Sequence, residues 1–536
     1  MPFLTYMTRK PPPYVLHSML AAIGGLLFGL DTGTIGPLTT MAQFDSYFGK
    51  LSPTIHGLLV SSILIPASVT SFFAGTVADR LGRVGTIFVG GFLFSLGTAL
   101  EAAAQNLAML FVGRCVTGVG EGLFLSTLIV YIIEISPPHQ RGVLASIPQF
   151  LTTFGICVGY FVCYGTVNVE GSSLSWRLPW ALISFIAVFY GALVFFFLPQ
   201  SPRWLKSKGR FEEAALAWER LGIPSVEAEK EDDSQGQDQK PADGSEHHHS
   251  FHPEPLTYPD PESHALAPMH SRTSVPGAPT SSDSWLRVFH RDVRSRTLLA
   301  AFILGMQQLS GIDGVLYYAP LLFQQAGLSS SQASFLASGV SALLMMLITI
   351  PGFLYADAWG RRTSTIYGGL GITACMLIIG SLYASGAVHT DYGAARWVVV
   401  VLIYVFALTF SATWALHMRV YASEVQPLRT RAPATSLALT SNWCVNFLVA
   451  LTTPIILAHT SYGLYFLFGG STLLTVVVCA VKMPETRGRS LEEIDEAFSK
   501  GSLSGKMGHE GGTEKVIRRA SAKEPAVTAS SKDCEV

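Results

Sequence analysis

One acidic residue, Asp31, lies inside the first long apolar stretch of the chain, residues 19–37. An ionisable side chain at membrane depth costs roughly 2.5–3.5 kcal/mol on insertion scales, which marks it as a candidate functional residue. Five glycines leave the backbone of this stretch open to close packing by other helices, and Pro37 weakens the helix near its end. The pattern predicts a mobile helix in which Asp31 binds and releases a proton in a solute carrier.

The composition of the 536-residue chain indicates a membrane protein. Only 14% of its residues are charged, whereas about 25% is usual in soluble domains. A net charge of −1 argues against a nucleic acid or an anionic surface as partner. The seven cysteines show no paired spacing that would indicate disulfides or a zinc site. We therefore expect no metal and no cofactor.

About twelve apolar segments are long enough to span a bilayer as helices. Six precede a long polar insert and six follow it, near residues 15–38, 53–78, 84–104, 107–133, 142–166, 178–198, 298–324, 333–356, 364–385, 397–422, 433–458 and 462–482. Most arginines and lysines between these segments fall on one side, which the positive-inside rule places in the cytosol together with both termini and the insert. The predicted fold class is an all-α membrane protein with twelve transmembrane helices.

The polar segments set the expected domain boundaries. They are a cytosolic N-terminus (1–13), six helices (14–200), a cytosolic linker (201–296), six helices (297–482) and a cytosolic tail (483–536). Residues 201–222 have helical periodicity, whereas residues of about 224–284 and most of the tail are too polar to bury a core and are expected to be disordered. The histidines at 247–249 could form a weak metal-binding tract, but a solvated low-complexity run is the favoured interpretation.

Short charged motifs recur in the two halves. GTVADRLGR (75–83) matches GFLYADAWGRR (352–362), YIIEISPPHQRG (131–142) matches YASEVQPLRTRA (421–432), and PQSPRW (199–204) matches PETRGRS (484–490). Each pair places charged groups at a cytosolic helix end, where arginine can fork to a carboxylate. Positive-inside topology alone would require neither the acids nor the repeat. We expect a latch that holds the two halves together in one conformation, formed by Asp79, Arg83, Glu134, Arg141, Asp357, Arg361, Glu424 and Arg431.

These motifs, together with QQLSGI followed by YY and the run PETRGRSLEEID, resemble the sugar porter family of the major facilitator superfamily. The resemblance covers nearly the whole chain outside the linker and the tail. It implies two pseudo-symmetric six-helix bundles around a central site that opens alternately to each side. It also implies a monosaccharide-like substrate that is moved without chemical change, and therefore no enzyme.

The resemblance further implies a sugar site lined by amides. Such groups suit hydroxyl-rich sugars because they both donate and accept hydrogen bonds without charge. The residues that match the family's positions in helices 5, 7 and 11 are Gln149, Gln307, Gln308, Asn442 and Trp443, with Tyr317 and Tyr318 matching its outer-gate aromatics. The alternative is that the polar side chains among them only join helices.

Three positions depart from the family pattern. Asp313 stands where an asparagine is usual, Arg419 replaces a tryptophan of the sugar pocket, and Ala415-Leu416 replaces a Gly-Pro that loosens helix 10. Asp313 and Arg419 would both face the central cavity. They would pair there around a neutral sugar, which is the favoured interpretation, or Arg419 would receive the carboxylate of a sugar acid. In a third interpretation, Arg419 lies at the cytosolic helix end and only snorkels.

Proton coupling follows from the same resemblance. Proton-coupled members keep an aspartate at the position of Asp31 and pair it with a helix 4 arginine, which matches Arg114. Beside Arg114 the carboxylate stays ionised, whereas separation in a dry cavity favours uptake of a proton. The alternative is a permanent ion pair that only holds helices 1 and 4 together. Glu121, seven residues after Arg114, is unusual for the family and would compete for this arginine.

The resulting hypothesis is a monomeric plasma-membrane transporter that imports a monosaccharide, a hexose or a pentose, together with a proton. Three alternatives stay open: a facilitative sugar uniporter, a symporter of a sugar acid or polyol, and a non-transporting sugar receptor. The short tail is unlike that of receptors built on this scaffold. The sequence shows no nucleophile–base pair or phosphate loop that would indicate an enzyme.

Overall fold

The computed structural model describes residues 11–137, 140–169, 171–223, 287–290, 293–328, 330–355, 359–389, 393–427 and 430–487. Within these ranges the chain is helical and contains no strand, and twelve helical segments are long and apolar enough to cross a membrane. Each predicted segment coincides with one of them to within four residues at either end. The predicted fold class is therefore confirmed.

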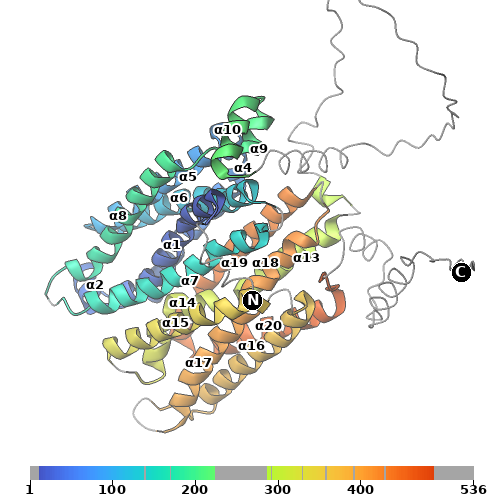
Figure 1. Cartoon of the computed structure of the whole chain (residues 1–536). Helices are drawn as coiled ribbons and strands as arrows, with labels where there is room; N and C mark the ends of the chain where they lie inside the picture. Colours follow the sequence, from blue (N-terminus) through green and yellow to red (C-terminus); the bar gives the residue numbers. More distant parts are fainter. Residues whose placement is uncertain are drawn as a thin grey trace, which may run out of the picture.

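The twelve spans form two bundles, coloured blue to green and yellow to red, that lie side by side (Figure 1). The first bundle contains α1 (Pro13–Thr39), α3 (Pro53–Ser61) with α4 (Leu64–Leu81), α5 (Arg83–Ala102), α6 (Leu107–Ile135), α7 (Arg141–Thr166) and α8 (Leu174–Phe197). The second contains α13 (Arg294–Leu309) with α14 (Ile312–Gln325), α15 (Ser331–Tyr355), α16 (Arg361–Ala384), α17 (Ala395–Ala412) with α18 (Trp414–Glu424), α19 (Arg431–His459) and α20 (Gly463–Lys482). Short helices α2 (Ala42–Phe48), α9 (Pro202–Ser207) and α10 (Phe211–Leu221) and the 3₁₀ turn η2 (Arg287–Phe289) lie outside the spans.

Helices α9 and α10 mark one side of the molecule, which we call the α9 side, and the opposite side is the far side. The start of α1 belongs to the α9 side, because Pro13 packs against Gly222 at the end of α10. Trp204 of α9 donates its indole N–H to the carbonyl of Asp79 at 3.1 Å, which fixes α9 against the end of α4. The long segment expected to be disordered, about 224–284, lies outside the described residues.

Three of the spans are broken near their middle. The second is interrupted between α3 and α4 at Ser62, and the seventh between α13 and α14 at Gly311, which has φ +90°. Only glycine adopts this conformation readily, and a Cβ here would also collide with the ring of Phe468. The tenth span breaks at Thr413 (φ −121°, ψ −70°) although it lacks the family's Gly-Pro. A break leaves helix-end groups without partners inside the helix, so polar side chains can bind them.

The glycines of α1 bring its backbone against α7. A Cβ at Gly29 would lie 2.8 Å from the carbonyl carbon of Thr152 and 3.0 Å from the Cα of Gly155. Gly33 makes a similar approach to Ile156. The structure confirms that these glycines allow close helix packing. The packing against α7 fixes the orientation of α1, and with it the position of Asp31.

The two bundles meet in the middle of the membrane and on the far side. Gly36 of α1 lies directly against the backbone of Tyr317 in α14, and Gly57 of α3 lies against the carbonyl of Leu451 in α19. Nearer the centre, Phe28 packs edge-on against Trp443, with ring centroids 6.1 Å apart. Helix α1 therefore contacts both α14 and α19 of the other bundle.

Candidate functional site

The predicted partners Asp31 and Arg114 form a buried ion pair. One guanidinium nitrogen of Arg114 lies 2.7 Å and 2.9 Å from the two carboxylate oxygens of Asp31. Only 3% of Asp31 and 1% of Arg114 are exposed, so water screens the pair little. A second guanidinium nitrogen donates to the carbonyl of Val60 at 3.2 Å. Val60 lies in the last turn of α3, where carbonyls lack donors from their own helix.

Two glutamates surround this pair, and together the four side chains form what we call the acidic cluster: Asp31, Glu101, Arg114 and Glu121. Glu101 of α5 is fully buried, and its carboxylate lies 3.8 Å from Arg114. Its other oxygen is 2.6 Å from the hydroxyl of Thr117. Glu121 of α6 is 1% exposed, and neither of its carboxylate oxygens has a hydrogen-bond partner. The cluster therefore contains three carboxyl groups and one cation.

The expected sugar-binding amides of the second bundle bond to one another. Gln308 donates to the amide oxygen of Asn442 at 3.1 Å, and Asn442 donates to the carbonyl of Leu304 at 2.9 Å. Gln307 donates to the carbonyl of Trp414 at 2.8 Å, just beyond the break in the tenth span. These contacts join α13, α18 and α19, so the amides do hold helices together. The oxygen of Gln308 is buried without a partner and stays available as an acceptor.

Arg419 of α18 reaches across to the first bundle. Its guanidinium donates to the side-chain oxygen of Gln149 at 2.9 Å, and its side chain is exposed. Arg419 and Asp313 attract one another electrostatically, but within the described residues no ion pair of 4.0 Å or less joins them. The direct pair favoured from sequence is therefore absent from this conformation. The hydrogen bond to Gln149 also disagrees with an arginine that only snorkels at a helix end.

The predicted aromatic residues lie where the two bundles close. Tyr318 donates its hydroxyl to the carbonyl of Ala450 at 2.7 Å, and its ring meets that of His56 from α3 edge-on. Tyr317 and Trp443 are both buried against α1. On the same side, Tyr160 of α7 donates to the carbonyl of Leu316 in α14. These contacts join α14 and α19 of the second bundle to α1, α3 and α7 of the first.

The latch residues pair within each bundle. Arg83 binds Glu134 at 3.0 Å and Asp79 at 2.7 Å, all in the first bundle. Arg361 binds Glu424 at 3.2 Å in the second bundle. Arg141 donates to the carbonyl of Ser136 at 3.1 Å, while Asp357 and the side chain of Arg431 lie outside the described residues. The ion pairs seen among the described residues join neighbouring helices of one bundle. A latch between the two bundles stays a prediction.

Two further acids with structural contacts, the half-buried Glu485 and the buried Glu101, were not among the predicted site residues. Glu485, in the PETRGRS motif, accepts the backbone N–H groups of Arg361 at 2.8 Å and Arg362 at 3.1 Å, and so caps the start of α16. The repeat itself was the signal, since Gln200 of the matching PQSPRW motif accepts from the backbone of Val84 at the start of α5. Glu101 could have been found as an acid inside an apolar span.

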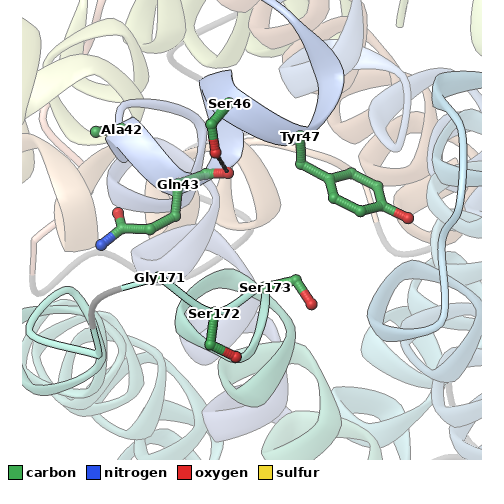
Figure 2. Close-up of a pocket in the computed structure, with 7 residues that line it drawn as sticks. All are labelled: Ala42, Gln43, Ser46, Tyr47, Gly171, Ser172 and Ser173. Atoms are coloured by element: carbon green, nitrogen blue, oxygen red, sulfur yellow. Dashed lines mark hydrogen bonds between the residues drawn. The ribbon is translucent and has the colours of Figure 1, made fainter.

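A separate pocket of about 410 Å³ lies on the far side (Figure 2). Its lining comes from α2 and the segment before α8: Ala42, Gln43, Ser46, Tyr47, Gly171, Ser172 and Ser173. The hydroxyl of Ser46 points back to the carbonyl of Gln43 at 2.9 Å (Figure 2). None of the predicted site residues lines this pocket. Within the described residues, no group of three His, Cys, Asp or Glu side chains is arranged to hold a metal ion.

Known proteins resemble this chain over most of its length. The sugar transport protein MST7 of Oryza sativa is 28% identical over 508 residues, covering 90% of each chain. The glucose transporter GlcP of Staphylococcus epidermidis is 29% identical, covering 89% of this chain and 95% of its own. Among solved structures, the inward-open xylose transporter XylE from E. coli superposes with a TM-score of 0.69 at 22% identity, covering 89% of this chain and 98% of that one.

The solved structure establishes the major facilitator fold. The family model described as "Sugar (and other) transporter" matches residues 17–498, nearly the whole of the chain outside its two ends. Together with twelve helices able to span a bilayer, this match shows that the chain is a multi-pass membrane protein of the sugar transporter family.

Proposed function

We propose that this protein is a symporter that imports a monosaccharide together with a proton by alternating access. The observation that carries the proposal is the ion pair between Asp31 and Arg114, which is buried and lies on two different helices of the first bundle. A relative by fold, XylE, is described as a proton:xylose symporter, at 22% identity and a TM-score of 0.69. We propose no chemical change of the sugar.

The contacts of α1 explain how proton binding would act on sugar binding. Protonation of Asp31 removes the charge that holds Arg114, and so releases α1 from α6. The same helix touches Tyr317 through Gly36 and Trp443 through Phe28, both next to the expected sugar site. A shift of α1 therefore changes that site, and because linkage is reciprocal, bound sugar changes the affinity for the proton.

The sugar would bind between the bundles, against Gln149, Asp313 and Arg419 and beside the amides of α13 and α19. An uncharged hexose or pentose fits a site in which amides both donate and accept hydrogen bonds.

A second candidate substrate, a sugar acid, is favoured by one specific observation. Arg419 is exposed and bonded to the neutral amide of Gln149, and no carboxylate of the described residues forms an ion pair with it. Arginine in this state can bind a carboxylate through two parallel hydrogen bonds.

The proposal includes an orientation. We place both termini, α9 and α10 in the cytosol, because Arg83, Arg141 and Arg361 all lie at helix ends on one side. The far side, which Tyr160, Tyr317 and Tyr318 close, then faces the exterior of the plasma membrane. We further propose that one chain is sufficient for transport, since both bundles and the site between them come from a single chain.

Uptake by the purified protein in lipid vesicles tests the main proposal. With an inward proton gradient, the wild type is expected to accumulate sugar above the outside concentration, and Asp31→Asn is expected only to equilibrate it. Glu213→Gln on α10, an exposed carboxylate paired with Arg210, is the matched control and should accumulate sugar normally. Equal accumulation by Asp31→Asn and the wild type would refute the coupling, while wild-type equilibration without accumulation would identify a uniporter. Binding without any uptake would identify a receptor.

A competition panel separates the two substrate classes. A hexose, a pentose, a polyol and a uronate are added in turn against labelled sugar, for the wild type and for Arg419→Ala. If the substrate is a sugar acid, the uronate competes with the wild type and loses this effect in Arg419→Ala. If the uronate never competes, the sugar-acid candidate is excluded.

A further inference from the structure

The acidic cluster holds more carboxyl groups than its cation can neutralise. Asp31, Glu101 and Glu121 are each no more than 3% exposed, and Arg114 is the cation among them. If all three acids were ionised, the cluster would carry a charge of about −2, and each unpaired buried ion costs several kcal/mol. One nitrogen of Arg114 contacts both carboxyl oxygens of Asp31, so Asp31 is the acid whose charge this cation offsets most directly. The two glutamates are therefore neutral in this conformation, and each carries a proton.

Glu101 has one hydrogen-bond partner among the described residues, the hydroxyl of Thr117. The Thr117 hydroxyl lies 2.6 Å from one carboxyl oxygen of Glu101, to which it donates, and 3.0 Å from the carbonyl of Gly113, while the other carboxyl oxygen lies 3.8 Å from Arg114 without a hydrogen bond. The Thr117 hydroxyl thus fixes the position of Glu101 between α5 and α6.

Glu121 has no comparable arrangement. Both of its oxygens are buried and unpartnered. The charged groups that act on it are Asp31 from α1, Glu101 from α5 and Arg114 from its own helix, and Tyr317 of α14 lies within electrostatic range. Helices α4 and α7 also pack on α6, but their charged residues, Asp79, Arg80 and Arg141, lie at helix ends. The cation available to an ionised Glu121 is therefore Arg114.

The position of Glu121 gives this interaction a direction. It follows Arg114 by seven residues, two helical turns or about 10.5 Å along α6. Helix α6 runs towards the α9 side, since Glu134 near its end pairs with Arg83 beside the end of α4. Glu121 thus lies closer to the α9 side than Asp31 does, on the face of α6 that carries Arg114. The Nε–H of Arg114 is buried and has no acceptor, so the arginine has an unused donor.

We infer that Glu121 is the group that releases the transported proton to the α9 side, an inference that rests on the proposed symport. A proton from the far side binds the carboxylate of Asp31, and the freed guanidinium of Arg114 moves to Glu121. The carboxyl O–H of Glu121 breaks, its proton leaves to water on the α9 side, and the carboxylate pairs with Arg114. The site resets when the proton of Asp31 passes to Glu121 and Arg114 returns to Asp31. One proton enters and one leaves in each cycle.

Glu121→Gln tests the inference because an amide keeps the shape of the neutral acid but cannot release a proton. In vesicles with an inward proton gradient, sugar accumulation is expected to fall by roughly tenfold. Exchange of labelled for unlabelled sugar at equal concentrations needs no net proton release and should persist. Glu213→Gln, the same substitution at an exposed site of α10, should accumulate sugar as the wild type does.

Comparison with Asp31→Asn separates this inference from the proposed function. If Asp31→Asn loses accumulation while Glu121→Gln retains it, the symport stands and the role of Glu121 is refuted. If neither variant loses accumulation, the coupling through Asp31 fails, and the inference fails with it. If the wild type only equilibrates the sugar, both fail together.

Infrared spectroscopy covers the case in which Glu121→Gln does not fold. A protonated buried carboxyl group has a C=O stretching band that is absent from the ionised form. The wild type should show such a band, sensitive to deuterium, and the conservative variant Glu121→Asp should shift it. Glu213→Asp should leave the band unchanged. A wild-type spectrum with no component that responds to Glu121→Asp would overturn the assignment of the proton.

Discussion

Replacing Arg114 should destabilise the protein more than replacing its partner Asp31. Arg114→Met leaves the carboxylate of Asp31 buried without a cation, and removing one member of a buried pair costs about 3–5 kcal/mol. Asp31→Asn leaves Arg114 with the Val60 carbonyl at 3.2 Å and Glu101 at 3.8 Å. Glu101 can ionise and replace Asp31 as the counter-ion. We therefore expect the loss of unfolding free energy in Asp31→Asn to be smaller by about 1.5 kcal/mol or more, the lower end of the range for a hydrogen bond to a charged group.

The double variant Asp31→Asn, Arg114→Met extends this comparison. It removes the cation together with the carboxylate that was ionised, so the cluster is left with two neutral acids. Its loss of unfolding free energy should be smaller than that of Arg114→Met alone, and the two substitutions should therefore be strongly non-additive. Purely additive losses would mean that the two side chains do not interact in the folded protein.

The assay is denaturant unfolding of the purified protein in mild detergent, followed by fluorescence of its nine tryptophans. Arg210→Met is the matched control, because the pair of Arg210 with Glu213 is about half exposed (49% and 52%). Exposed pairs of this kind contribute roughly 0–1 kcal/mol. If Asp31→Asn proved as destabilising as Arg114→Met, Glu101 would not be an alternative counter-ion, and the account of the acidic cluster would be refuted.

Three further predictions concern packing and hydrogen bonding. Gly29→Ala should lower the thermal stability by the equivalent of about 1–3 kcal/mol, since overpacking would force α1 away from α7. Gly75→Ala is its control, because a Cβ at Gly75 meets nothing within 4 Å. Equal melting temperatures of the two variants would contradict the packing argument. Glu485→Ala should cost about 0.5–2 kcal/mol in the same assay by removing the cap of α16, and wild-type stability would show that water replaces the cap. Tyr160→Phe removes the hydrogen bond to the Leu316 carbonyl and should weaken the closure of the two bundles on the far side by about 0.5–1.5 kcal/mol. Hydrogen exchange of the backbone amides in α14 measures this effect. Unchanged exchange rates would show that the hydrogen bond of Tyr160 does not stabilise the closure.

The sequence predicted the spans and the pairing of Asp31 with Arg114 well because both depend on strong signals. Long apolar runs identify membrane helices, and Asp31 stands out as a rare acid among them. The breaks were less visible. Gly311 needs its glycine for a positive φ, but Thr413 breaks the tenth span with no glycine or proline at that position.

Partner choice among polar groups could not be predicted from residue types. Arg419 and Asp313 have opposite charges, yet Arg419 bonds to Gln149 of the other bundle. The choice depends on which side chains the two bundles bring together at one depth, which is a property of their packing. The latch illustrates the same limit, because the repeat suggested charged residues that hold the two halves together, whereas Arg83 pairs with Glu134 of its own bundle.

The distance along the chain between Asp31 and Arg114 has a consequence for biosynthesis. The two residues are separated by 83 positions, so α1 leaves the ribosome long before its cation is made. At roughly 5–20 residues per second, the interval is about 4 to 17 s. During that time an ionised Asp31 in the lipid would cost roughly 2.5–3.5 kcal/mol. The first helix must therefore wait at the translocon, or enter the bilayer in its neutral form, until the fourth span arrives.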